Sequence, residues 1–208
     1  MRIRRLVVGE LETNCYVVAD DEGDAVIIDP GGDAQRIMRW VEEEALTPTC
    51  ILCTHGHPDH IFAAGLLQET FNVDLRVHQL DTALVARGVG EMEFLFDMQA
   101  FRKPILGNPI SDGEIVPVGD TGLTVIQTPG HTPGSVCLLC GQDLFSGDTL
   151  FAGGVGRTDL AGGSETALLK SIQAKLLVMD DEVSVHPGHG PETTIGDEKR
   201  SNPWLRKG

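Results

Sequence analysis

The sequence predicts an α/β fold in which two β-sheets lie back to back and helices cover both outer faces. Two observations predict it. Short apolar segments, bounded by turns that contain Gly and Asp, alternate with longer segments of helical periodicity. This order, a cluster of strands followed by strand–helix–strand units, occurs in the first half of the chain and again in the second. The 208 residues, 41% of them hydrophobic, suffice for one domain that spans residues 1–208.

The first half predicts a series of strands and three helices. The strands are predicted at Arg2–Val8, Asn14–Ala19, Asp24–Ile28, Thr49–Thr54 and Leu75–His78. The helices are predicted at Asp33–Leu46, Ile61–Phe71 and Gln79–Ala86. In the first of these helices, Ile37, Trp40 and Val41 share one face at helical spacing, which indicates a face that packs on a sheet.

The second half repeats the scheme. Its strands are predicted at Glu114–Val118, Leu123–Thr128, Ser135–Cys140, Asp143–Ser146 and Val183–His186. One helix, Glu165–Leu177, precedes the last strand. Between the two halves, Glu91–Lys103 has an ambiguous pattern and is predicted to be helical.

The composition excludes several classes of function. Lys and Arg number 16 and Asp and Glu number 31, so the formal charge is −15, which disfavours binding to nucleic acid or to an anionic membrane. No apolar run approaches the ~20 residues of a membrane helix, and the apolar stretch after the basic N-terminus is too short for a secretory signal. The odd number of cysteines, 5, indicates reduced thiols and a cytoplasmic protein.

Two cysteine pairs invite comparison with a zinc ribbon. They are Cys50 with Cys53, and Cys137 with Cys140, each pair within a predicted strand. Residues i and i+3 of a strand point to opposite faces, so the members of a pair are not expected to share a metal ion. Buried free thiols are therefore predicted instead.

The strongest chemical signal is the segment Thr54–His60, which reads Thr-His-Gly-His-Pro-Asp-His. In an extended loop that leaves a strand, His55, His57 and Asp59 point to the same side. His60, at the start of the next helix, points to a neighbouring position. One loop therefore offers nitrogen and oxygen ligands for two adjacent metal half-sites.

Three further segments with polar residues follow apolar strands and contain Gly or Pro. They are Thr128–Gly134, Phe145–Thr149 and His186–Gly190. Taken alone, His131 or His189 is as compatible with a surface or capping role, and Asp148 with a turn or a helix N-cap. Because functional loops gather at strand ends, their occurrence together with the Thr54–His60 loop favours a metal site.

The order of these motifs resembles the metallo-β-lactamase fold superfamily, and within it the short bacterial glyoxalase II type, a hydroxyacylglutathione thioesterase. The motifs are His-x-His-x-Asp-His, Pro-Gly-His-Thr-x-Gly, Ser-Gly-Asp-Thr-Leu-Phe and Pro-Gly-His-Gly. The resemblance spans Gly9 to Leu205 and includes the segment Ile28–Gly32. It implies an αββα sandwich of two mixed β-sheets with a dinuclear metal site at one edge.

The resemblance also implies a role for individual residues. The ligands it implies are His55, His57 and His131 for the first ion, Asp59, His60 and His189 for the second, and Asp148 between the two. Asp59 and Asp148 are accordingly the catalytic carboxylates. Asp29 is expected to orient the histidine loop and His186 to have a supporting role without ligating.

Five imidazoles and two carboxylates form a donor set that suits zinc best and also iron or manganese. Two divalent ions about 3.5–4 Å apart can share a water molecule and lower its pKa toward 7. We hypothesise that hydroxide bridging the ions attacks the carbonyl of a thioester such as S-lactoylglutathione, which makes a small-molecule thioester the expected partner.

Recognition of the thiol carrier carries less support from the sequence. Glyoxalase II has a Lys and, two residues later, a Tyr where this chain has Arg157 and Asp159. Arg157 is expected either to pair with a glycine carboxylate of glutathione or to form an ion pair with Asp159 within its loop. The helical region that grips glutathione in full-length glyoxalase II would begin about where this sequence ends.

Three alternatives remain beside the thioesterase. A persulfide dioxygenase holds a single iron with two His and one Asp, and it shares the histidine loop and a stretch like Gly156–Asp159. A lactonase or another hydrolase of the fold would differ only in its substrate. A metal-binding module without activity is the third. The segment Pro187–Pro191 favours the hydrolase because it completes a second metal site. The sequence makes no prediction of the oligomeric state.

Overall fold

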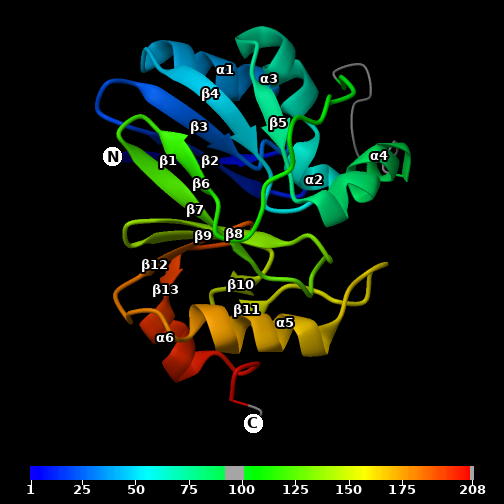
Figure 1. The fold of residues 1–208 in the computed structure, drawn as a ribbon, viewed down its shortest axis with the longest axis vertical. Helices are drawn as coiled ribbons and strands as arrows, with labels where there is room; N and C mark the ends of the chain where they lie inside the picture. The colour runs from blue at the N-terminus through cyan, green and yellow to red at the C-terminus, as the bar shows by residue number, and fades with distance from the viewer. Residues whose placement is uncertain (92–100, 207–208) are drawn as a thin grey trace.

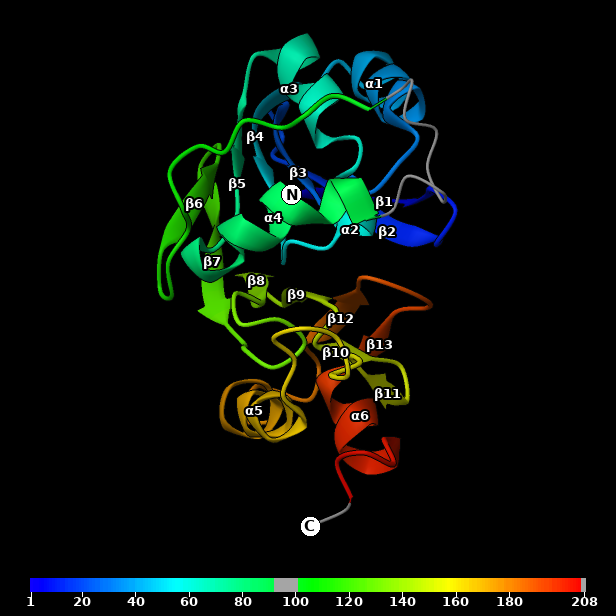
Figure 2. The same ribbon diagram turned by 90° about the vertical axis from the view of Figure 1, so that its right-hand side faces the viewer.

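Two mixed β-sheets form the centre of the molecule, and helices cover the outer face of each. The computed structural model describes residues 1–91 and 101–206. Helices α1 (Ala34–Glu43) and α3 (Ala64–Phe71) lie outside one sheet, and α5 (Glu165–Ser171) and α6 (Ile195–Ser201) lie outside the other (Figures 1 and 2). This is the αββα arrangement that the sequence predicts.

The first sheet has the strand order β1-β2-β3-β4-β5. Its strands are β1 (Arg2–Val8), β2 (Thr13–Ala19), β3 (Asp24–Ile28), β4 (Thr47–Leu52) and β5 (Asp74–Arg76). The first three run antiparallel, whereas β3, β4 and β5 are parallel neighbours. Parallel neighbours need a crossover connection, which α1 provides between β3 and β4. Helices α2 (Pro58–Ile61) and α3 provide it between β4 and β5.

The second sheet has the order β13-β12-β9-β8-β7-β6. Its strands are β6 (Ile115–Val118), β7 (Thr121–Gln127), β8 (Val136–Cys140), β9 (Asp143–Gly147), β12 (Ser184–Pro187) and β13 (Thr193–Thr194). Among its described strands, β9 and β12 are parallel neighbours and the other pairs are antiparallel. The chain between them forms the hairpin β10 (Leu150–Phe151) and β11 (Gly154–Val155), then α5 and the π-helical turn η2 (Ile172–Leu176).

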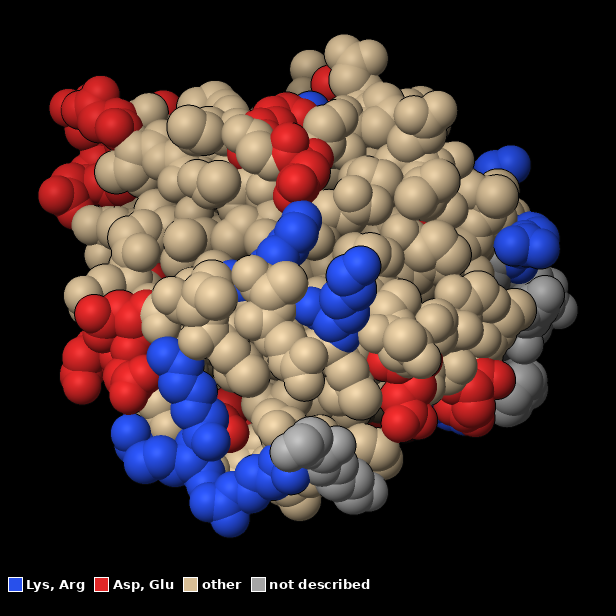
Figure 3. Space-filling view, turned by 60° about the horizontal axis from the view of Figure 1, so that its bottom comes forward, with Lys and Arg blue, Asp and Glu red and all other residues tan. Residues whose placement is uncertain are grey.

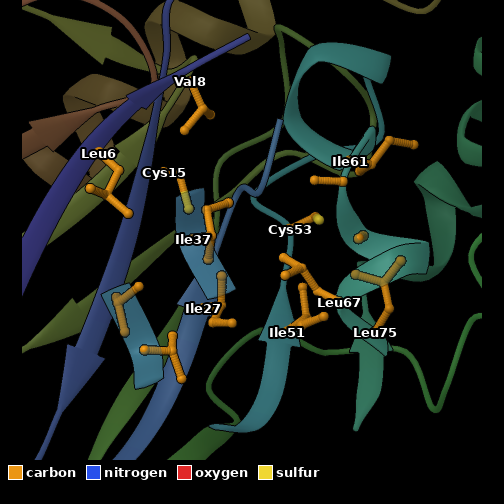
Figure 4. Packing of buried hydrophobic residues seen from close by; sticks show 14 of the residues in the cluster. Leu6, Val8, Cys15, Ile27, Ile37, Ile51, Cys53, Ile61, Leu67 and Leu75 are labelled. Atoms are coloured by element: carbon orange, nitrogen blue, oxygen red, sulfur yellow. The ribbon is translucent and has the colours of Figure 1, made fainter. Parts of the chain in front are cut away.

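Adjacent residues of the central strands belong to different cores, which is why these strands are apolar without alternation. Ile27 and Ile51 pack outward against α1 and α3, where Figure 4 shows Ile37 and Leu67 beside them. Ile28 and its neighbours point the other way, into the core between the sheets. A third core lies between the second sheet and the C-terminal helices. Three apolar layers therefore stabilise the two sheets.

The cysteine prediction is confirmed. All five thiols are free and buried. Cys50 and Cys140 lie in the core between the sheets, whereas Cys53 and Cys137 lie in the two outer cores. Burial raises the pKa of Cys50 and of Cys137 to about 11, so these thiols stay protonated at neutral pH and are poor metal ligands.

The structure differs from the sequence prediction at the helix predicted for Ile61–Phe71. This segment is divided between α2, which ends at Ile61, and α3, which begins at Ala64. The backbone N–H of Ala63 donates to the carbonyl oxygen of Pro30 at 2.9 Å, so a contact from another part of the chain interrupts the helix. The helix predicted within Glu91–Lys103 concerns mainly residues 92–100, which lie outside the described residues.

The helix predicted for Gln79–Ala86 is a short 3-10 turn, η1 (Gln79–Asp81), followed by helix α4 (Thr82–Glu91). In the described part of the chain, no helix has the length and apolar character that crossing a membrane requires. Figure 3 looks onto the end of the molecule that carries α6 and shows acidic and basic side chains in neighbouring groups. Lys199 and Arg200 there pair with Asp181 at 2.6 and 3.8 Å.

Helix α6 and the hairpin that it holds are not among the elements predicted from the sequence. The Thr194 hydroxyl accepts a hydrogen bond from the Asp197 N–H and caps the helix, a signal that Thr-x-x-Asp at 194–197 carries in the sequence. Glu198 is 2% exposed, and its carboxylate accepts from the Gly153 N–H at 2.9 Å. Asn202 donates to the Gly154 carbonyl at 3.0 Å and to Glu198 at 2.7 Å. Helix α6 thus anchors the β10–β11 turn.

Replacing Glu198 with Ala is expected to lower the free energy of unfolding by about 2 kcal/mol, because it leaves the buried side-chain amide of Asn202 and the N–H of Gly153 without this acceptor. Urea denaturation followed by circular dichroism measures this change. Glu182→Ala, at an exposed position, is the control and should change the stability by less than about 0.5 kcal/mol. Equal effects of the two substitutions would contradict the anchoring role of Glu198.

Candidate metal centre

The segments that carry the predicted ligands converge at one edge of the sandwich. The histidine loop follows β4, and α2 begins inside it with Pro58 as its first residue. The predicted ligands His131, Asp148 and His189 follow β7, β9 and β12 of the second sheet. Because strand ends from both sheets meet here, residues that lie far apart in the sequence become neighbours.

Three imidazoles form the first half of the site. Nε2 of His131 lies 3.2 Å from Nε2 of His55 and 2.8 Å from Nδ1 of His57. His55 and His131 are 1% and 2% exposed. The three nitrogen atoms lie within 4.8 Å of one another, which is close enough for a single ion to be bound by all of them.

The second half of the site combines a carboxylate with two imidazoles. Oδ2 of Asp59 lies 3.3 Å from Nε2 of His189 and 3.6 Å from Nε2 of His60. Asp148 lies between the two halves. Its Oδ1 is 3.4 Å from Nε2 of His60, and its Oδ2 is 3.6 Å from Nε2 of His131. The structure therefore brings all seven predicted ligands into one cluster.

Buried atoms without partners show that this cluster fits cations. Nε2 of His60 and Oδ1 of Asp148 are buried and have no hydrogen-bond partner among the described residues. Burying such atoms unpaired is costly. A divalent ion bound by nitrogen and oxygen atoms would satisfy Nε2 of His60 and Oδ1 of Asp148, so the donor set and its geometry suggest a dinuclear metal centre.

Asp29 connects to both halves of the site. Its backbone has φ of 50°, a left-handed conformation that is uncommon for a residue other than Gly. Its carboxylate accepts from the N–H and from the hydroxyl of Thr54, both at 2.7 Å, and Oδ2 lies 3.0 Å from Nδ1 of His60. The Thr54 hydroxyl gives its hydrogen to Asp29, so it accepts from Nδ1 of His55 at 3.1 Å. This directs the Nε2 lone pair of His55 into the cluster.

Arg157 contacts the site through its backbone. Nδ1 of His131 donates to the carbonyl oxygen of Arg157 at 2.8 Å, which leaves Nε2 of His131 free to bind an ion. The Arg157 side chain pairs with both carboxylate oxygens of Asp159, at 2.8 and 2.7 Å. Of the two alternatives predicted for this side chain, the ion pair within the loop is the one present in the structure.

His186 lies beside the cluster and not in it. Its Nε2 is 2.8 Å from Oδ1 of Asp143, and its ring stacks on Phe145 with centroids 5.0 Å apart. The next residue, Pro187, accepts hydrogen bonds at its carbonyl oxygen from Asn14 at 2.9 Å and Tyr16 at 2.8 Å. These contacts hold the strand that leads to His189.

Two buried polar residues at the site escaped the sequence analysis. Asn14 also donates to the carbonyl oxygen of Gly190 at 2.9 Å. Its position as a polar residue in an otherwise apolar strand is the sequence feature that could have identified it. Asp81 accepts a hydrogen bond from the N–H of Gly56 at 2.9 Å. Nothing in the local sequence around Asp81 distinguishes it from an ordinary turn residue.

The two halves of the site differ in how readily their imidazoles are protonated when no ion is bound. Burial lowers the pKa of His55 well below its ordinary value and the pKa of His57 to about 4, and neighbouring imidazoles add to both effects. Burial also opposes protonation of His60, but the carboxylates of Asp148, Asp59 and Asp29 outweigh it and raise the pKa of His60 to about 10.

Known proteins resemble the chain over its whole length. A family model described as the metallo-beta-lactamase superfamily matches residues 8–191. Hydroxyacylglutathione hydrolase GloC of Haemophilus influenzae is 38% identical over 210 residues, which cover 99% of this chain and 98% of the relative.

Two solved structures extend the comparison. TTHA1623, solved in a di-iron-bound form, is 38% identical with a TM-score of 0.86, and the alignment covers 97% of this chain and 100% of that one. ETHE1 from Myxococcus xanthus is 32% identical with a TM-score of 0.83, covering 98% of this chain and 84% of that one. The chain belongs to the metallo-β-lactamase superfamily.

Proposed function

We propose that the protein is a dinuclear metal-dependent hydrolase that cleaves a thioester such as S-lactoylglutathione. The observation that carries the proposal is the position of Asp148, whose two carboxylate oxygens face one imidazole of each half-site at 3.4 and 3.6 Å. A carboxylate placed in this way fits two ions side by side. The similarity to GloC along nearly the full length of both chains supports the choice of a hydroxyacylglutathione thioester.

In this proposal His55, His57 and His131 hold the first ion, Asp59, His60 and His189 hold the second, and Asp148 contacts both. A bound pair of divalent ions supplies an activated water at neutral pH and polarises the carbonyl group of the substrate. The protein contributes orientation, because the hydrogen bonds of Thr54 and of the Arg157 carbonyl fix the rings of His55 and His131. The neighbouring imidazoles of His60 and His189 outweigh burial and lower the pKa of Asp59, which keeps this carboxylate ionised and able to bind.

A persulfide dioxygenase with a single iron is the second candidate function, supported by the similarity to ETHE1. Such a site uses one ion, whereas this chain also brings together Asp59, His60 and His189. We therefore prefer the hydrolase. A lactonase or another hydrolase would use the same centre with a different substrate.

We also propose zinc as the bound metal and the cytoplasm as the compartment. Zinc suits five imidazoles and two carboxylates, and the di-iron form of a similar protein keeps iron as an alternative. Five buried free thiols support a reducing compartment such as the cytoplasm.

Metal analysis beside two activity assays separates the two candidates. The protein, purified without chelator, is expected to contain about two divalent ions per chain and to hydrolyse S-lactoylglutathione, with activity lost on chelation and restored by added metal. A single iron per chain, with oxygen consumption when a persulfide is added, would overturn the hydrolase proposal. Elemental analysis, a thiol-release assay and an oxygen electrode provide the measurements.

Replacing Asp148 with Ala is expected to remove the group shared by both half-sites, so both ions should be lost and kcat should fall about 1,000-fold or more. Metal content and thioester hydrolysis are measured on the same samples. Asp21→Ala, where the side chain is 91% exposed, is the control and should keep both. Retention of full activity by the Asp148 variant would rule out the shared-carboxylate centre.

The two half-sites should respond differently to pH. At pH 7 the imidazole of His60 is protonated in the metal-free protein, since its pKa is about 10, and an ion must displace that proton. The affinity of the second half-site should therefore rise about tenfold per pH unit between pH 7 and 9. The first half-site should change little there, because the pKa of His57 is about 4.

Titration of the metal-free protein with zinc at pH 6.5, 7.5 and 8.5, in competition with a chelator, measures both affinities. Proton release during the titration gives an independent reading, with at least one proton released for the second ion. Identical pH dependence of the two binding steps would contradict the unequal protonation of the half-sites.

A further inference from the structure

Asp81 is a buried carboxylate next to the metal centre that is not one of its ligands. It is the last residue of η1, the 3-10 turn after β5, and it is 0% exposed. No ion-pair partner of Asp81 is present in residues 1–91 and 101–206, and a buried carboxylate of this kind persists only where several hydrogen bonds compensate its lost hydration. Its partners therefore indicate its role.

The partners of Asp81 come from two different ligand loops. Oδ2 accepts from the N–H of Gly56 at 2.9 Å and from the hydroxyl of Thr132 at 2.7 Å. Oδ1 accepts from the N–H of Gly134 at 2.7 Å. Gly56 lies between the ligands His55 and His57, and Thr132 directly follows the ligand His131. One carboxylate thus links the two loops that supply the first half-site.

Both loops approach Asp81 at a glycine. A Cβ atom on Gly56 would lie 2.9 Å from the carbonyl oxygen of Asp81, and one on Gly134 would lie 2.5 Å from its Oδ1. Each contact is too short for a side chain, so the small residues allow the loops to close on the carboxylate. The motif residues Gly56, Thr132 and Gly134 therefore serve Asp81 and not the ions directly.

We propose that Asp81 is a positioning residue that sets the separation between His131 and the pair His55 and His57, and thereby the affinity of the first half-site for its ion. This inference rests on the proposed dinuclear centre. Asp81 itself touches neither an ion nor the substrate. It holds the two loops in the arrangement in which the three imidazole nitrogens lie within 4.8 Å of one another.

Replacing Asp81 with Asn preserves the shape of the side chain but not its accepting capacity. Three donors face the carboxylate, and the amide group of Asn would turn its own N–H donors toward at least one of them. Loss of a partner that orients metal ligands typically costs 10–100-fold in metal affinity. We expect a loss of about this size in the first half-site, with the second half-site unchanged.

Asp20 provides a matched control. Its Oδ1 likewise accepts three hydrogen bonds, from the backbone N–H groups of Glu22, Gly23 and Asp24 at 3.0, 2.7 and 2.9 Å. It belongs to the turn between β2 and β3 and contacts none of the ligand loops. Asp20→Asn therefore reproduces the loss of an accepting carboxylate without affecting the metal centre.

The experiment compares zinc binding by the metal-free full-length protein and its Asp81→Asn, Thr132→Val and Asp20→Asn variants. Chelator competition gives two affinities for each. Asp81→Asn should weaken one binding step about 10–100-fold and leave the other within about twofold, and Asp20→Asn should leave both within about twofold. Thr132→Val removes one of the three donors and should show a smaller loss of zinc affinity in the binding step that Asp81→Asn weakens. If Asp81→Asn does not fold, the Thr132→Val variant tests the proposal.

Imidazole NMR spectra of the metal-free proteins provide a readout that does not depend on activity. In Asp81→Asn the signals of His57 and His131 should shift, while those of His60 and His189 stay in place. Unchanged spectra and two wild-type affinities would overturn the proposal, as would an equal loss in both binding steps. Failure of the wild-type protein to bind two ions would instead contradict the proposed function.

Discussion

The structure depends on the close approach of five imidazoles and two carboxylates at one edge of the sandwich. Without ions this cluster is electrostatically strained, since burial and mutual repulsion keep His55 neutral while the carboxylates hold a proton on His60. Such a cluster persists only because the surrounding framework holds the ligand loops in place. The three apolar cores supply that framework, and the strand ends of both sheets deliver the loops to the same place.

The hydrogen bonds around the cluster show how the framework acts on the imidazoles. Asp29 fixes the start of the histidine loop through Thr54, and the backbone carbonyl of Arg157 fixes His131 from the opposite side. The rings of His55, His60 and His131 are therefore each oriented by a group outside the proposed ligand set. Pre-orientation of this kind reduces the entropy that is lost when an ion binds. Small residues such as Gly56 occur beside the proposed ligands because the orienting groups approach the backbone there too closely for a side chain.

The candidate site could be predicted from the sequence because its ligands follow strand ends that are themselves predictable from apolar runs. The local pattern of the Thr54–His60 loop was enough for His55, whereas Asp148 and His189 were predicted only from the combination and order of the motifs. Neither signal was enough for Asp81, whose importance comes only from contacts with loops some 25 and 51 residues away. The break before Ala64 escaped for the same reason, since its cause is a backbone contact with Pro30. Local periodicity records burial, whereas such long-range hydrogen bonds leave no trace in neighbouring residues.

The β10–β11 hairpin connects the C-terminal helix α6 to the candidate metal centre. The hairpin begins two residues after Asp148 and ends two residues before Arg157, so a proposed ligand precedes it and the acceptor for His131 follows it. Its turn is held by Glu198 and Asn202 of the C-terminal segment. The last helix thus supports the candidate metal centre in addition to the core on which Ile195 packs.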